Sequence, residues 1–138
     1  MIKKYTGDFS LDNVTYLSLK QLQLHSYGDV VFCGGLQEID LSGNQLTCIN
    51  PLAPLLDLKI LNLSSNHITS LQGIEPLIQL RNFDVRDNYI ASIDMLKPLL
   101  LLPQLTSVAL QGIGGQLPNP GKILRIITII NIIFYMIF

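Results

Sequence analysis

The residues best suited to acid–base or metal chemistry are few, and their spacing does not group them. The only histidines are His25 and His67, and neither accompanies a nucleophile motif of the kind that hydrolysis or group transfer needs. The two cysteines, Cys33 and Cys48, form no C-x-x-C pair, so zinc ligation is not predicted. We therefore expect a non-enzymatic protein with no catalytic residues, no metal and no cofactor. Both thiols are expected to be buried or half-buried as small apolar groups, and His67 is expected in an exposed turn.

The composition limits which kinds of partner and which cell compartment we expect for this chain. The 138 residues, 49% of them hydrophobic, are enough for one domain with a full core. A net charge of -1 with 14% charged residues offers no basic surface for a phosphate backbone, so nucleic acid is not an expected ligand. Two cysteines are too few for a disulfide-dense secreted domain, and residues 1–8 lack the apolar core of a signal peptide. We expect an intracellular, cytoplasmic monomer.

A repeated pattern runs through most of the chain. Six-residue strings of the form L-x-x-L-x-L begin at residues 14, 36, 58, 80 and 105, so their starts are 22, 22, 22 and 25 residues apart. In three of them an asparagine follows the string, and an apolar residue stands two positions later. Further apolar residues recur at three-residue steps in the central repeats: Ile49, Leu52 and Leu55; Leu71, Ile74 and Leu77; and Ile93, Leu96 and Leu99.

The two kinds of spacing predict two kinds of local structure. A step of two puts alternate side chains on opposite faces of a strand, so Leu61 and Leu63 should point inward while Ile60 points outward. A step of three suits 3₁₀ or short α-helical turns, whose side chains return to the same core. Because no single repeat can bury its apolar set, the repeats must stack.

The predicted fold is therefore an α/β solenoid of about five repeats. It is a curved, right-handed arc with a parallel β-sheet on its concave side and short helical or 3₁₀ segments on its convex side. We divide the chain into an N-terminal cap at 1–13, a repeat region at 14–120 and a hydrophobic tail at 121–138. The repeats are placed at about 14–35, 36–57, 58–79, 80–104 and 105–120.

The repeated asparagine has a structural explanation. It falls where the chain turns inward after the strand and leaves backbone groups without sheet partners, and a carboxamide can both donate to them and accept from them. Leaving such groups unsatisfied costs about 1–3 kcal/mol each. We therefore predict a structural asparagine ladder made of Asn44, Asn66 and Asn88.

The 22-residue consensus resembles a class of leucine-rich repeats. This class includes the regulatory repeats of a protein phosphatase, the spliceosomal A-prime subunit and axonemal dynein light chain. The resemblance implies a protein that works by binding another protein, whose identity it does not give. It carries no functional residue over to this chain.

The sequence after Pro120 departs from that pattern. Isoleucine makes up half of residues 123–138, and no charge follows Arg125. Such a run is strongly β-prone and promotes aggregation when exposed. We therefore predict that 121–138 are a non-native or atypical ending, such as a retained intron. As a helix, sixteen residues would span about 24 Å, which is short of the roughly 30 Å hydrocarbon core of a membrane.

The outward-facing strand positions are the candidate binding residues. They project from adjacent parallel strands, so a partner segment can touch several of them together. The predicted partner-binding set is Glu38, Asp40, Ile60, Asn62, Asp84, Arg86 and Tyr89. The favoured hypothesis is a protein-binding adaptor that uses this concave face. Two alternatives stay open: a membrane-associated repeat protein that uses the apolar tail, and a regulatory subunit of an enzyme such as a phosphatase.

Overall fold

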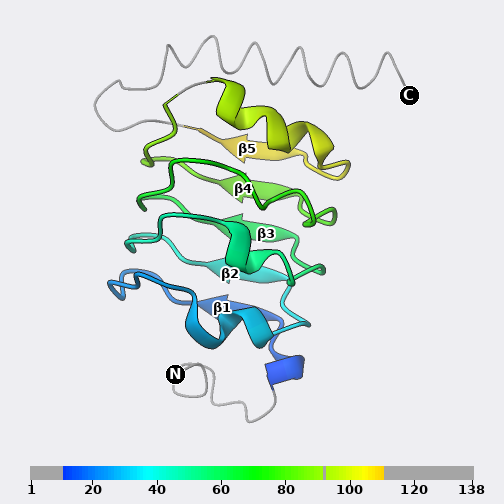
Figure 1. Cartoon of the computed structure of the whole chain (residues 1–138). Helices are drawn as coiled ribbons and strands as arrows, with labels where there is room; N and C mark the ends of the chain where they lie inside the picture. The colour runs from blue at the N-terminus through cyan, green and yellow to red at the C-terminus, as the bar shows by residue number, and fades with distance from the viewer. Residues whose placement is uncertain (1–10, 92, 111–138) are drawn as a thin grey trace.

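The computed structural model describes residues 11–91 and 93–110. Its five strands form one parallel sheet in the order β1-β2-β3-β4-β5, and each strand pairs with the next one along the chain (Figure 1). The strands are β1 (Tyr16–Ser18), β2 (Glu38–Asp40), β3 (Ile60–Asn62), β4 (Asn82–Asp84) and β5 (Ser107–Ala109). Every strand lies inside one of the predicted six-residue strings, so the predicted repeat register is confirmed.

Short helical segments connect the strands on one side of the sheet, in front of it in Figure 1. The connecting helices are 3₁₀ helices: η2 (Gly28–Phe32), η3 (Asn50–Leu52) and η4 (Ile93–Leu101); a further 3₁₀ helix, η1 (Leu11–Asn13), precedes β1. The segment between β3 and β4 forms successive turns instead. There the amide of Ile74 donates to Leu71 O, and the amide of Leu77 donates to Ile74 O. The three-residue apolar spacing therefore produces three-residue hydrogen-bonded turns.

The core lies between the sheet and these connecting segments. Leu61 and Leu63 of the central repeat are at most 1% exposed, whereas Ile60 is 36% exposed. Burial therefore alternates along the strand as predicted, and the three-residue positions Leu71, Ile74 and Leu77 also join the core. The fold is the predicted solenoid with a parallel sheet.

Buried asparagines hold the turn that follows each central strand. The Asn66 amide donates to the carbonyl oxygens of Leu41 and Leu63 at 3.0 and 3.1 Å, and its Oδ1 accepts from the Leu46 backbone N–H at 3.0 Å. One side chain thereby joins its own turn to the preceding repeat. Asn44 and Asn88 make the corresponding bonds one repeat earlier and one repeat later.

The residue before each asparagine position has a left-handed backbone conformation. Gly43 has φ of +67°, while Ser65 and Asp87 at the equivalent positions both have φ of +54°. Glycine adopts this region without a Cβ penalty, and other residues adopt it at a cost. The turn that aims the asparagine inward therefore constrains the backbone in every central repeat.

Several sequence predictions fall outside the described residues. These are the first ten residues of the predicted cap, the end of the predicted fifth repeat at 111–120 and the whole tail at 121–138. The prediction for the cysteines is half wrong: Cys33 is buried, but Cys48 is exposed. Cys48 directly precedes the buried Ile49, and its side chain lies outside the three-residue apolar spacing.

Candidate protein-binding surface

The outward strand positions form two columns that run across the sheet. The first column is Tyr16, Glu38, Ile60, Asn82 and Ser107, and the second is Ser18, Asp40, Asn62, Asp84 and Ala109. Neighbouring members of each column are direct partners in the strand register. We call these two columns together the concave face. Since adjacent strands are about 4.8 Å apart, each column presents one side chain at every strand interval.

The first column is the accessible one. Tyr16 is 57% exposed and Ile60 is 36% exposed, which makes them the large apolar side chains on this face. Glu38 lies between them on β2 and is half-buried. Tyr16 was not in the predicted binding set, although its place in the same column as Ile60 was a sufficient signal to include it.

The second column is half-buried and takes part in the turns after the strands. Asp40 Oδ1 accepts from the backbone N–H of Ser42 at 3.0 Å and from its hydroxyl at 2.6 Å. Asn62 Oδ1 accepts the same two bonds from Ser64 at 3.0 and 2.8 Å. Sequence reasoning treated Asp40 and Asn62 as free to contact a partner, but these bonds give them a structural role.

Asp84 is held in a similar way, and it also forms an ion pair. Its Oδ1 accepts from the Arg86 backbone N–H at 3.1 Å. The Arg86 guanidinium donates from Nε to Oδ1 at 3.0 Å and from Nη2 to Oδ2 at 2.6 Å. The hydrogen bond to Asp84 is the main reason that the pKa of Arg86 is raised. The two side chains therefore present one paired unit at the end of β4.

The carboxylates on β2 differ from Asp84. Among residues 11–91 and 93–110, neither Glu38 nor Asp40 has an ion-pair partner, whereas Asp84 is paired with Arg86. Both carboxylates project from the same face of one strand, two residues apart. The β2 part of the concave face therefore presents two carboxylates that no described residue pairs with.

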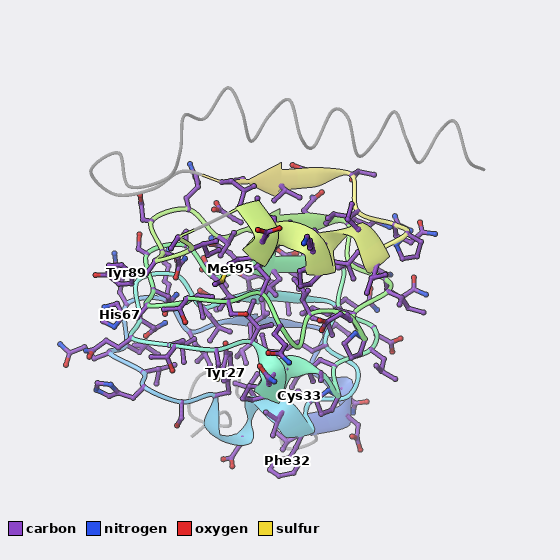
Figure 2. All side chains as sticks on the ribbon, turned by 45° about the horizontal axis from the view of Figure 1, so that its top comes forward. Tyr27, Phe32, Cys33, His67, Tyr89 and Met95 are labelled. Atoms are coloured by element: carbon purple, nitrogen blue, oxygen red, sulfur yellow. The ribbon has the colours of Figure 1, made fainter. Side chains whose placement is uncertain are left out.

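Two aromatic rings lie beside the concave face, on the turns after β3 and β4. His67 and Tyr89 have ring centroids 5.6 Å apart at an interplanar angle of 48°, and Figure 2 shows them next to each other. Tyr89 is 52% exposed and His67 is also exposed, as predicted for a turn residue. The pair extends the accessible surface beyond the ends of the strands.

A second set of exposed apolar side chains lies on the connecting segments, which contributed no residue to the predicted binding set. Leu56 and Ile78 occupy equivalent positions two residues before a buried leucine of the next string, and they are 55% and 51% exposed. Leu101 at the end of η4 is 64% exposed. These residues are accessible apolar groups on the connecting segments and not on the concave face.

The described part of the chain has neither a metal-binding cluster nor a membrane-spanning helix. Residues 11–91 and 93–110 contain no group of three or more histidine, cysteine, aspartate or glutamate side chains that could hold a metal ion. Over the same ranges, no helix is long and apolar enough to cross a membrane.

Comparison with known proteins identifies the architecture. Residues 34–77 match the sequence model of a family described as Leucine Rich repeats (2 copies). The fold is a leucine-rich-repeat solenoid. No curated protein matches the chain.

Two solved leucine-rich-repeat structures are similar to this solenoid. An internalin from Listeria monocytogenes is 26% identical with a TM-score of 0.71, and the match covers 80% of this chain and 34% of the internalin. Internalin C2 from the same organism is 21% identical with a TM-score of 0.62, over 80% of this chain and 62% of its own length. The chain thus spans less than two thirds of either structure.

Proposed function

We propose that this leucine-rich-repeat solenoid is a non-enzymatic adaptor whose partner protein docks on the concave face. The observation that carries the proposal is the in-register array of exposed side chains around Tyr16 and Ile60. Repeat solenoids use such extended surfaces to bind other proteins. A rigid sheet also holds the contact residues in place before binding, which lowers the ordering cost of association.

The proposal extends to the cell compartment and the oligomeric state. An intracellular, cytoplasmic monomer fits the low cysteine content and the mixed surface charge. We further propose a closer kinship with leucine-rich repeat-containing protein 61 over about residues 5–120. This part of the proposal rests on the residue patterns at 6–11, 41–44 and 51–53.

Titration of surface variants against a recovered partner tests the proposed binding face. Affinity purification with the full chain supplies the partner; Ile60→Glu then probes the concave face, and Arg86→Ala probes the Asp84–Arg86 pair at the end of β4. Each should weaken binding by at least about 1–2 kcal/mol, roughly tenfold, because apolar and arginine contacts at the centre of an interface carry most of its energy.

The matched controls alter the connecting segments. Lys97→Glu changes an exposed residue that forms an ion pair with Asp94 within η4, and Ile78→Glu replaces an exposed isoleucine with a charged residue. Both should leave the affinity unchanged. Loss of binding in Ile78→Glu, with Ile60→Glu unaffected, would move the interface to the connecting segments and refute the proposal.

A further inference from the structure

Three side chains of the first column, two of them exposed and one half-buried, define a short row on the concave face. Tyr16, Glu38 and Ile60 are consecutive partners in the strand register, so they project side by side from β1, β2 and β3. The inward residues beside them are buried, which fixes the direction in which this row points. The row therefore has an apolar group at each end and a carboxylate in the middle.

The charge around this row selects the chemistry of a partner. Glu38 and Asp40 have no ion-pair partner among the described residues. The nearby basic residues do not pair with these carboxylates. Lys59, just before β3, donates from Nζ to Gln37 Oε1 at 2.8 Å, and Arg81 lies just before β4. An opposite charge placed over Glu38 would complement the acidic β2 position, and complementary charges favour both encounter and register.

The spacing of the row selects the conformation of a partner segment. Side chains two strand intervals apart are separated by about 9.6 Å. Residues i and i+7 on one face of an α-helix are about 10.5 Å apart, with residue i+3 or i+4 between them. In an extended segment, the first and third residues on one face are about 13 Å apart. The i to i+7 spacing of a helix differs from the length of the row by about 1 Å, whereas the corresponding spacing in an extended segment differs from it by more than about 3 Å.

We infer that the concave face receives an amphipathic helix of the partner that lies across β1, β2 and β3. A lysine or arginine of this helix faces Glu38, and apolar side chains one turn away on either side contact Tyr16 and Ile60. This inference rests on the proposed function and adds the conformation and chemistry of the docking segment. An apolar helix face against an apolar surface is a recurring mode of recognition.

Selection from a displayed library of helical peptides tests the inference directly. The library has an alanine- and glutamine-rich helical scaffold with positions i, i+4 and i+7 randomised, and it is selected against the full chain. We expect enrichment of an apolar residue at i, lysine or arginine at i+4, and an apolar residue at i+7. A parallel library of proline-containing extended peptides should give weaker enrichment.

Variants of the full chain then assign the contacts of the selected peptides. Glu38→Lys should weaken their binding at least tenfold, and selection against Glu38→Lys should shift position i+4 to aspartate or glutamate. Glu38→Gln should give a smaller loss because it removes only the charge. Circular dichroism and thermal melting of each variant confirm that it is folded.

The outcomes separate this inference from the proposed function. Peptides that bind through Ile60 but show no charge preference, or a preference that Glu38→Lys does not change, would overturn the inference and leave the concave face as the binding surface. Peptides that Ile78→Glu disrupts and Ile60→Glu does not would overturn the proposed function as well. Absence of enrichment in the helical library would also overturn the inference.

Discussion

Replacing Asn66 with leucine measures what the asparagine ladder contributes to stability. The side chain is 2% exposed, so its hydrogen-bond partners have little access to water. The carbonyl oxygens of Leu41 and Leu63 also accept from Asn44 and Asn88, at 2.8 and 2.9 Å, and would keep those donors. The Leu46 N–H has Asn66 Oδ1 as its acceptor and would lose it.

The expected loss of stability in Asn66→Leu follows from the one lost acceptor and the two weakened carbonyl interactions. One buried donor left unsatisfied costs about 1–3 kcal/mol, and the weakened bonds to the shared carbonyls add about 1 kcal/mol. We therefore expect the free energy of unfolding to fall by about 2–4 kcal/mol, although leucine is the more apolar residue. Total stability of a domain is about 5–15 kcal/mol, so the change is a large fraction of it.

Urea unfolding of the full chain, followed by circular dichroism, provides the measurement. Asn82→Leu is the control, because Asn82 is exposed in the first column of the same sheet and substitution there should change the free energy by no more than about 0.5 kcal/mol. If Asn66→Leu unfolds at the same urea concentration as the wild type, the buried hydrogen bonds are not what holds the turn.

Three further predictions test the core, the backbone and the thiols. Leu63→Ala should lower the free energy of unfolding by about 2–5 kcal/mol, since Leu63 is fully buried; a melting temperature lowered by no more than a degree or two would contradict its inward placement. Gly73→Ala should cost about 1–3 kcal/mol, because φ is +96° and an added Cβ would lie 2.6 Å from the backbone of the preceding repeat. Gly34→Ala is the control in the same chemical-denaturation experiment. It should leave the free energy of unfolding nearly unchanged, because the added Cβ would have open space around it. In the native protein at neutral pH, iodoacetamide should modify the exposed Cys48 and spare Cys33, because burial raises the pKa of the Cys33 thiol and keeps it protonated; mass spectrometry showing equal modification would contradict this.

The sequence predicted the strand positions well for two reasons. The leucines within one string must face the core, and the leucines of the neighbouring strings require the same register. A shift of the register by one residue would expose Leu61 and bury Ile60, and every neighbouring repeat imposes the same choice. The positions of Ser65 and Asp87 in left-handed turns were not predictable in this way. Their residue types do not require positive φ, and Gln21 at the equivalent position of the first repeat also has φ of +56°, although Leu22 and not an asparagine follows it.

The candidate surface was predicted only in part, for a related reason. Alternation of side chains predicts which residues of a strand point outward, but both columns satisfy that rule. The difference between Ile60 and Asp40 depends on a hydrogen bond to a residue two positions later. Aspartate or asparagine followed two residues later by serine was the available signal for this turn in two of the repeats.

The most direct test of the central claim is photo-crosslinking of the partner from defined positions on the full chain. A photoreactive residue replaces Ile60 on the concave face in one sample, and Ile78 or Lys97 on the connecting segments in the others. The concave-face account predicts that the recovered partner is crosslinked from position 60 and not from positions 78 or 97. Crosslinking from 78 or 97, with none from 60, would contradict it.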